Sequence, residues 1–435
     1  MKKILKKIII SILTIEARVV LWRFKPKIVV VTGTVGKTST KDALYTVFSK
    51  FFYTRGNNKS FNSEIGVPLT ILDLKNQWNN PFGWLKNIFL GLAYVFLPSR
   101  YPRWLILEIG TDRPGDIQSV AKWLKPDIVV TTRFATIPVH VEFFDTPEDV
   151  IAEEQSIAFA LKKDGVLVVN NDDEHAVALR KKIDCKSVSF GMGEMVGVRA
   201  SHVETLYAEV GEYKKPTGIR FRADHGEMSG PVAIEGVLGV QHVYPVLAAL
   251  AAGASQDLNI VKMSQAFNEH HKTPPGRMKI IEGRKNVTII DDTYNSSPVA
   301  VESALLALCG LELPGRKIAI LGDMKELGRF SKREHEKVGK MAGDCADLLV
   351  FVGDASAHFA EGAFASSIKK ENVYEFARAD QAAAFMLEHA QEHDVVLVKG
   401  SQSIRLEKVV EALMRDPEKK KSLLVRQEKE WEKRK

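Results

Sequence analysis

The chain has 435 residues, 45% of them hydrophobic, which is typical of a globular protein too long for one ordinary core and indicates two or three domains. A net charge of +7 would suggest a nucleic-acid partner if it were spread along the chain. Instead, residues 1–27 carry +7 and residues 415–435 carry +4, which leaves −4 for the body of the protein. This distribution argues against a nucleic-acid groove. The three cysteines lie far apart without metal-binding spacing, so we assign them no chemistry.

The N-terminal segment, residues 1–26, is predicted to form a basic amphipathic helix. It starts like a signal peptide but has no small-residue cleavage site, and Glu16 and Arg18 leave its apolar run short of the ~20 residues of a spanning helix. Two interpretations stay open: residues 1–24 lie at a membrane interface, or they dock on the protein's own surface. A second apolar segment, residues 82–97, could lie beside the first on a membrane or be a core helix.

Residues 32–40 read Thr-Gly-Thr-Val-Gly-Lys-Thr-Ser-Thr between an apolar run and a helical pattern, which predicts a phosphate-binding loop. Glycines at positions 33 and 36 allow backbone N–H groups to point at phosphate oxygens, Lys37 adds a positive charge, and Thr38 offers a hydroxyl to Mg²⁺. The spacing is short, with two residues rather than four between the first glycine and the Gly-Lys pair. The segment predicts that the chain binds a nucleoside triphosphate.

Short apolar runs alternate with helical patterns from residue 27 onward, which predicts parallel α/β architecture. Strands are predicted at 27–31, 104–109, 127–131 and 165–170, and in a second series at 287–291, 317–321, 348–352 and 395–399. Residues 198–237 resemble hairpins, and a helix fits 243–252. The prolines and glycine of 272–277 favour a domain boundary, and the residues after 415 are predicted to be a frayed helix or a disordered tail.

Polar residues follow several predicted strands, at the edge where an open α/β sheet places its ligands. Glu108 ends an apolar strand, so it needs a cation partner, either Mg²⁺ or an ordinary salt bridge. His140 lies in a loop after another strand, although a histidine there is more often a surface or core residue than a ligand. Residues 153–155 are expected to begin a helix whose first turn presents a carboxylate to the same crevice. In the second unit, polar turns follow three strands, at 291–298, 321–328 and 398–405.

Together these segments resemble the Mur ligase family, the ATP-dependent ligases that add amino acids to the peptidoglycan stem peptide, and most closely its branch that adds D-alanyl-D-alanine. The likeness covers roughly residues 28–415. The motifs that carry it are Gly33-Thr34-Val35-Gly36-Lys37-Thr38-Ser39, Asn62 to Thr70, Leu107-Glu108-Ile109-Gly110, Asp291-Asp292-Thr293-Tyr294-Asn295, Leu321 to Gly328, and Val398-Lys399-Gly400-Ser401.

The resemblance implies a P-loop central ATPase domain with a mainly parallel sheet and a hairpin region at 27–273, and a Rossmann-like α/β domain at 274–415, between the N-terminal helix (1–26) and a charged tail (416–435). It implies ATP and Mg²⁺ as cofactors and an acyl-phosphate intermediate that an amine attacks. The implied catalytic residues are Lys37, Glu108, His140 and Glu154, and the implied metal ligands are Thr38, Glu108 and His140. The implied nucleotide contacts are Gly33, Thr34, Gly36, Lys37, Thr38, Ser39, His242, Arg277, Asp292 and Tyr294.

Three departures from the family pattern matter. The family usually has a carbamylated lysine that supplies a carboxylate to a second Mg²⁺. The matching segment here reads Glu-Glu-Gln at 153–155 and has no lysine, so we expect the Glu154 side chain to supply that carboxylate directly. Gln241 and His242 stand at the polar positions of the family's adenine motif in place of its usual residues, and the resemblance implies adenine contact by His242. About thirty residues precede Gly33, where the family normally has a domain for the UDP-sugar end of the substrate. Two interpretations of the acceptor stay open: a lipid-linked acceptor, which a membrane-apposed N-terminus would suit, or another carboxylate.

The leading hypothesis is an ATP-dependent amide-bond ligase of peptidoglycan precursor synthesis, monomeric and cytoplasmic, that joins D-alanyl-D-alanine or a similar amine to a muropeptide-like carboxylate and binds no nucleic acid. Peripheral contact with the inner membrane face through residues 1–24 and 82–97 stays an open interpretation. Two alternatives stay open. One is a ligase of the cyanophycin or folylpolyglutamate synthetase type, which uses a different carboxylate. The other is a noncatalytic, membrane-associated nucleotide-binding scaffold.

Overall fold

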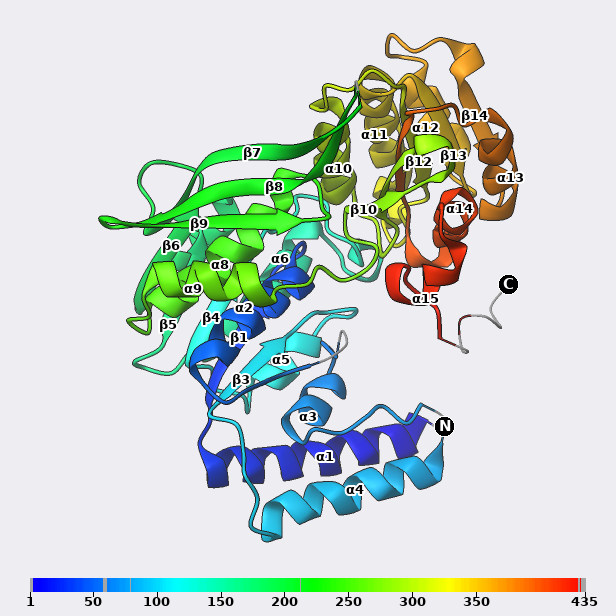
Figure 1. The fold of residues 1–435 in the computed structure, drawn as a ribbon. Coiled ribbons are helices and arrows are strands. Elements are labelled where there is room, and N and C mark those ends of the chain that lie inside the picture. The colour runs from blue at the N-terminus through cyan, green and yellow to red at the C-terminus, as the bar shows by residue number, and fades with distance from the viewer. Residues whose placement is uncertain (1–2, 58–60, 79, 212, 429–430, 432–435) are drawn as a thin grey trace.

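The computed structural model describes residues 3–57, 61–78, 80–211, 213–428 and 431. Two sheets organise these residues, and a pair of helices lies outside the first sheet (Figure 1). The helices are α1 (Lys3–Phe24), α2 (Lys37–Phe51), α3 (Gly66–Ile71), α4 (Pro81–Phe96), α5 (Asp116–Ala121), α6 (Pro147–Gln155), α7 (Glu174–Arg180), α8 (Val243–Ala254), α9 (Ile260–His270), α10 (Pro298–Cys309), α11 (Ser331–Cys345), α12 (Ser356–Ala363), α13 (Ala379–His389), α14 (Glu407–Leu413) and α15 (Lys420–Leu423).

The first sheet has the strand order β2-β3-β1-β4-β5-β6-β7-β8-β9. Its strands are β1 (Lys27–Thr32), β2 (Thr54–Gly56), β3 (Trp104–Glu108), β4 (Ile128–Thr131), β5 (Val166–Asn170), β6 (Lys186–Gly191), β7 (Val198–Val210), β8 (Tyr213–His225) and β9 (Met228–Glu235). Pairing is parallel from β2 to β7 and antiparallel among β7, β8 and β9. Strands β3, β4 and β5 are buried along their whole length, which explains their continuous apolar runs.

The second sheet has the order β10-β11-β15-β12-β13-β14, with only β10 antiparallel to its neighbour. Its strands are β10 (Lys279–Glu282), β11 (Thr288–Asp292), β12 (Lys317–Gly322), β13 (Leu348–Val352), β14 (Val373–Phe376) and β15 (Val395–Lys399). The eight strands and the hairpin region expected from the sequence are all present. Four short or half-exposed strands, β2, β6, β10 and β14, carry weaker apolar patterns and were not predicted.

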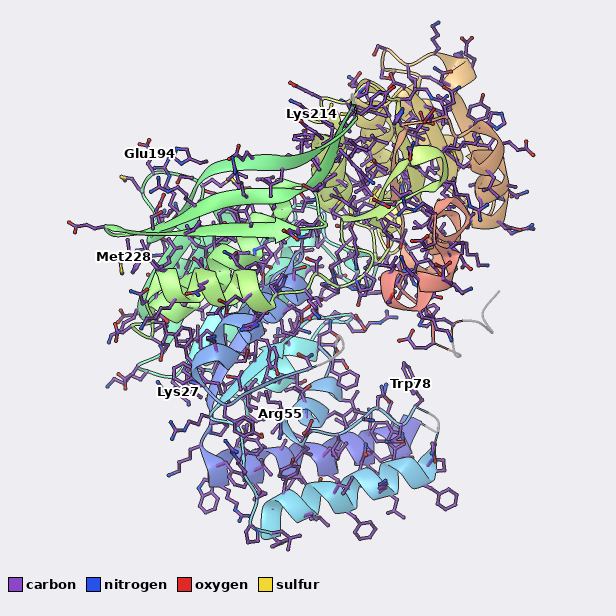
Figure 2. The ribbon with its side chains drawn as sticks, in the orientation of Figure 1. Lys27, Arg55, Trp78, Glu194, Lys214 and Met228 are labelled. Atoms are coloured by element: carbon purple, nitrogen blue, oxygen red, sulfur yellow. The ribbon has the colours of Figure 1, made fainter. Side chains whose placement is uncertain are left out.

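The expected N-terminal helix is α1, and it runs beside α4 in the same direction (Figure 1). The Arg23 side chain donates hydrogen bonds to the carbonyls of Tyr94 (3.0 Å) and Val95 (2.6 Å). These bonds give partners to carbonyl groups in the last turn of α4, which have no partner within the helix. In Figure 2, Arg55 of β2 lies between the sheet and this helix layer, and its guanidinium carbon is 5.6 Å from the ring centroid of Tyr94. None of the helices formed by the described residues is long and apolar enough to cross a membrane.

The C-terminal segment forms short helical turns over residues 417–423 and is anchored through Arg426, so of the two predictions, a frayed helix or disorder, disorder is wrong for the described residues up to 428. Arg426 is buried and pairs with the Glu407 carboxylate at 2.9 Å. It also donates to the carbonyls of Thr293 and Tyr294, each at 2.7 Å, so the tail supports the turn that follows β11. The rest of the predicted tail, at 429–430 and 432–435, lies outside the described residues.

Candidate active site

The phosphate loop joins β1 to α2 and has the backbone conformation that its glycines were expected to provide. Gly33 (φ +124°) and Gly36 (φ +90°) both lie at positive φ, and a Cβ atom on Gly33 would come within 2.3 Å of the Thr132 hydroxyl oxygen. No side chain of the described residues caps the N-terminus of α2. The Lys37 ammonium folds back over the loop, 2.5 Å from the Gly33 carbonyl oxygen. The loop therefore offers an anion the backbone N–H groups at the start of α2, which no described side chain caps, together with the positive charge of Lys37.

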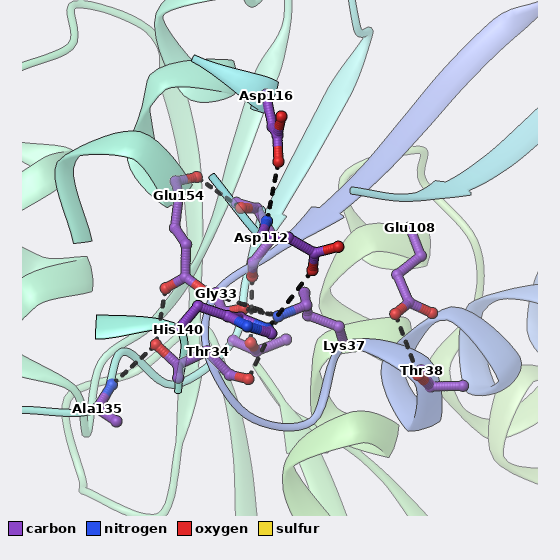
Figure 3. Close-up of polar contacts among 12 residues, drawn as sticks. Gly33, Thr34, Lys37, Thr38, Glu108, Asp112, Asp116, Ala135, His140 and Glu154 are labelled. Carbon is purple, nitrogen blue, oxygen red and sulfur yellow. Dashed lines mark hydrogen bonds and ion pairs between the residues drawn. The ribbon is translucent and has the colours of Figure 1, made fainter. Parts of the chain in front are cut away.

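Glu154 completes this loop from the side (Figure 3). Its carboxylate accepts a hydrogen bond from the Thr34 hydroxyl at 2.7 Å and lies 3.6 Å from the Lys37 ammonium. The side chain is buried, and burial raises the pKa of Glu154, against the opposing effects of Lys37, Thr34 and His140. The structure thus places one of the candidate catalytic carboxylates directly against the loop lysine.

Glu154 reaches the loop from the end of a helix, so the prediction that residues 153–155 begin one is wrong. Helix α6 starts at a capping box in which the Asp149 amide donates to the Thr146 hydroxyl (3.2 Å) and the Thr146 amide donates to the Asp149 carboxylate (3.0 Å). Glu154 therefore lies in the last turn.

The neighbouring Glu153 has a different role. Its carboxylate accepts from the backbone amides of Ile117 (2.7 Å) and Gln118 (3.0 Å), and from the Gln118 side-chain amide (2.9 Å). These bonds satisfy donors at the start of α5. Of the two adjacent glutamates, Glu154 alone contacts the phosphate loop through a bond described in the structure.

Thr38 and Glu108 form a second carboxylate–hydroxyl pair on the other side of the loop (Figure 3). Glu108 ends β3, next to β1, and accepts a hydrogen bond from the Thr38 hydroxyl at 3.1 Å. It is only 2% exposed, and its second oxygen has no hydrogen-bond partner among the described residues. A buried carboxylate oxygen left unpaired beside a hydroxyl fits the oxygen ligands that Mg²⁺ requires. Ser39 follows in the first turn of α2, half-buried.

His140 is held by carboxylates of two different units of the protein. Its Nδ1 atom lies 2.5 Å from the Glu326 carboxylate, beyond β12, and its Nε2 atom lies 3.6 Å from Asp112. The described contacts do not bring His140 to Thr38 or Glu108, the other two expected metal ligands. Sequence reasoning assigned no role to Asp112 or Glu326. Glu326 lies inside the 321–328 turn. The sequence motif therefore identified this turn as polar but did not indicate that Glu326 contacts His140.

The second sheet presents its polar cluster at the ends of β11 and β15. The Asp292 carboxylate lies 2.7 Å from the Lys399 ammonium and accepts from the Met278 amide at 3.1 Å. The Arg277 guanidinium carbon is 4.2 Å from the ring centroid of Tyr294, in cation–π geometry. Asp292, Arg277 and Tyr294 therefore lie on one edge of the second sheet. Lys399 joins them; the sequence marked it as part of the 398–405 turn but did not assign it to the site.

Two other residues of the polar motifs have structural roles. Asp291 is fully buried, accepts both the hydroxyl and the amide of Thr293, and has its pKa raised to about 6 by burial. Asp323 accepts the backbone amides of Asp354 and Ala355, each at 3.0 Å. Hydrogen bonds within the protein therefore account for Asp291 and Asp323, but not for the other polar residues of their turns.

His242 lies just before α8, and burial, reinforced by the charges of His271 and Arg277, lowers its pKa to about 3. Its Nε2 atom has no hydrogen-bond partner among the described residues, and neither has the buried side-chain oxygen of Gln241. The two residues thus form a small neutral polar site with unused hydrogen-bonding capacity.

A cleft of about 530 Å³ separates the two sheet units near His140. Its walls include Asp112 and His140 from the first unit, Asn295, Glu326 and Ser401 from the second, and Lys6 from helix α1. The cleft therefore places the loops of both units and the start of α1 around one space.

The chain matches two family models. The Mur ligase middle domain matches residues 31–82 and 90–253, and the Mur ligase glutamate ligase domain matches residues 276–402. Among curated proteins, it is similar to the UDP-N-acetylmuramoyl-tripeptide–D-alanyl-D-alanine ligases of Bacillus subtilis (strain 168; 25% identity, 92% of this chain and 79% of the relative) and Mycobacterium tuberculosis (H37Rv; 28% identity, 89% and 73%).

Solved structures show the same fold. A MurF crystal structure from Acinetobacter baumannii matches with a TM-score of 0.75 at 22% identity, covering 92% of this chain and 79% of that one. The MurF ligase of Thermotoga maritima in complex with ADP matches with a TM-score of 0.72 at 25% identity, covering 95% and 84%.

The fold and the site define an enzyme with a phosphate-loop unit and a second α/β unit facing each other across a cleft. With both family models matching over most of its length, the chain belongs to the Mur ligase family, whose members are ATP-dependent ligases.

Proposed function

We propose that this protein is an ATP-dependent ligase of peptidoglycan precursor synthesis that joins D-alanyl-D-alanine, or a similar amine, to the carboxylate of a muropeptide. The supporting observation is the loop in which Lys37, Thr34 and Glu154 meet on one side and Thr38 and Glu108 on the other. The names of the similar curated proteins support the choice of acceptor and amine.

A carboxylate does not react with an amine unless it is first given a leaving group. In the proposed reaction a muropeptide carboxylate oxygen attacks the γ-phosphorus of ATP and ADP departs. The amine nitrogen then attacks the acyl carbon, loses a proton, and inorganic phosphate departs with the former carboxylate oxygen. The protein's task is to position these groups and to offset the negative charge that accumulates between them.

Lys37 and the amides of the glycine loop are proposed to hold the triphosphate. Thr38 and Glu108 are proposed as magnesium ligands, because they place oxygens together and one of them lacks a partner. Mg²⁺ would supply charge compensation for the phosphates. The expected ligand role of His140 stays a prediction. With Glu326 and Asp112 as its described partners, His140 would have to leave them to join Thr38 and Glu108.

The nucleoside end of ATP is proposed to lie toward the second sheet. Arg277, Asp292 and Tyr294 are clustered there, and the half-exposed Tyr294 ring already stacks with a guanidinium. The free hydrogen-bonding atoms of Gln241 and His242 support adenine contact, because a neutral imidazole can bond a base edge. The monomeric state and cytoplasmic location stay predictions.

The proposal is tested by mass spectrometry of products formed from ATP, Mg²⁺, D-alanyl-D-alanine and UDP-linked or lipid-linked muropeptides. A ligated product with stoichiometric ADP is the expected result, and Lys37→Met serves as the inactive control. ATP turnover that needs neither acceptor nor amine, or no product from either muropeptide, would contradict it and favour a different carboxylate substrate.

A further inference from the structure

Helix α4 exposes a regular apolar stripe. Its apolar side chains at intervals of three and four residues are solvent-exposed: Phe82 (82%), Leu85 (52%), Phe89 (63%), Leu92 (37%) and Phe96 (74%). Five large apolar groups at this spacing lie on one face of a helix. The opposite face, with Trp84, is buried against the protein. The outer face of α4 thus has the composition of a core-facing surface without a covering element in the described structure.

Helix α1, the neighbour of α4, also has an exposed apolar stripe. Ile8 (50% exposed), Ile15 (59%) and Trp22 (76%) follow each other at intervals of seven residues, so they share one face. The inner face of α1 packs through Leu13 and Val20, which are fully buried. The two helices are neighbours (Figure 1), so their exposed residues lie on one layer of the molecule.

The charges of this layer identify what could cover it. Within residues 5–25 and 80–103 the one acidic residue is Glu16, and it is buried. All the exposed charged residues of these two segments are basic: Lys6, Lys7, Arg18, Arg23, Lys25, Lys86, Arg100 and Arg103. Exposed aromatic and aliphatic side chains among uniformly positive charges are complementary to an anionic lipid surface, where apolar groups enter the acyl boundary and cations meet the headgroups.

We propose that the exposed stripes of α1 and α4 bind an anionic membrane surface, so that the enzyme is a peripheral membrane protein. Lys6 and Ile10 of the same α1 helix line the cleft that holds His140 and Glu326. The cleft would then lie close to the membrane. Insofar as the proposed function holds, this favours an acceptor that is itself carried on a lipid.

Binding is measured first, without nucleotide or acceptor, by sedimentation of the full-length protein with vesicles of phosphatidylcholine alone or mixed equally with phosphatidylglycerol. The wild-type protein is expected to bind the mixed vesicles, and more weakly at high salt. The double variant Phe89→Ser/Phe96→Ser should bind at least about tenfold more weakly. Lys86→Glu should weaken binding about fivefold or more, since each basic residue near such a surface contributes about that factor.

Matched controls lie outside the layer. Phe159→Ser changes an equally exposed phenylalanine (59%), and Lys163→Glu changes an exposed lysine, so neither should alter vesicle binding. Equal binding of the layer variants and these controls would overturn the proposal. So would a wild-type dimer in sedimentation analysis that Phe89→Ser/Phe96→Ser converts to monomer without any vesicle binding, because the face would then join two copies of the chain.

Ligation is measured second, with UDP-linked and lipid-linked muropeptides, with and without mixed vesicles. Vesicles should raise the rate only for the lipid-linked acceptor, and Phe89→Ser/Phe96→Ser should remove that increase while leaving the UDP-linked rate unchanged. An equal response of both acceptors would overturn the substrate part. Vesicle binding without any ligation would refute the proposed function and still support the membrane face, so the two failures are distinguishable.

Discussion

The phosphate loop and the layer formed by helices α1 and α4 each contain one buried glutamate, and the two glutamates differ in their surroundings. Glu154 and Glu16 are each 4% exposed, and burial raises the pKa of both. Glu154 has a hydroxyl and an ammonium partner from the loop. Glu16 packs against Gly91 between the two helices, and neither of its carboxylate oxygens has a hydrogen-bond partner among the described residues.

The difference shows what each region is built for. Around the loop, Glu154 of α6, Glu108 of β3, Lys37 and Thr38 of α2, and Thr34 of the loop itself form paired polar contacts that have unused capacity for phosphates and a cation. In the helix layer, the Glu16 carboxyl group has no partner among the described residues. Its ionised form therefore lowers the stability of the folded protein, because burying a charge without a partner is energetically unfavourable. Burial raises the pKa of Glu16 to about 7, so the neutral carboxylic acid is the favoured form below about pH 7.

Removing the loop charge should have the largest effect. Lys37→Met is expected to lower ligation about 10³-fold, since it removes the cation closest to the phosphate loop and leaves Glu154 buried without its ion pair. Steady-state ATP turnover with both substrates measures this. Lys41→Met is the control one helical turn away: the Lys41 ammonium bonds the Asn57 carbonyl (2.8 Å), so its loss should reduce stability while the folded enzyme keeps its turnover. Equal losses of turnover would show that Lys37 acts only structurally.

A smaller loss is expected from Glu154→Ala, about 10²-fold, because the network loses a carboxylate but keeps its lysine. Glu153→Gln is the matched control, since it weakens the bonds to α5 without touching the loop. If Glu154 is a ready-made carboxylate in place of a carbamylated lysine, the wild-type rate should be the same with and without bicarbonate. A fully active Glu154→Ala enzyme, or a rate that depends on bicarbonate, would refute this role.

The sequence predicted the parts of this molecule that local chemistry determines. The loop at Gly33 requires glycine at positive φ, and strands buried on both faces require continuous apolar runs, so both were recognisable. The pairing of His140 with Glu326 joins residues 186 positions apart and depends on how the two units close, which no local pattern encodes. The start of α6 was missed because its signal, Thr-Pro with Asp149, lies seven residues before Glu153.

The least visible feature was Glu16, which the sequence showed only as an interruption of an apolar run. Because its pKa is raised from 4.5 to about 7, the folded state resists its ionisation. The resulting loss of folding stability is absent below pH 4.5, grows as the pH rises toward 7, and is fully present above pH 7. Glu16→Gln should therefore increase the free energy of unfolding by about 1–2 kcal/mol at pH 8, less than the full shift implies because the amide must also be buried.

Near pH 4.5 the same substitution should change stability little, so the gain has to appear as the pH rises. Urea unfolding of wild type and Glu16→Gln across this range measures it, with the exposed Glu312→Gln as a control that gains nothing at either pH. A gain of equal size at both pH values would mean that the substitution acts through packing against Gly91 rather than through charge. A loss at pH 8 would mean that the carboxylate has a stabilising partner, and the contrast with Glu154 would disappear.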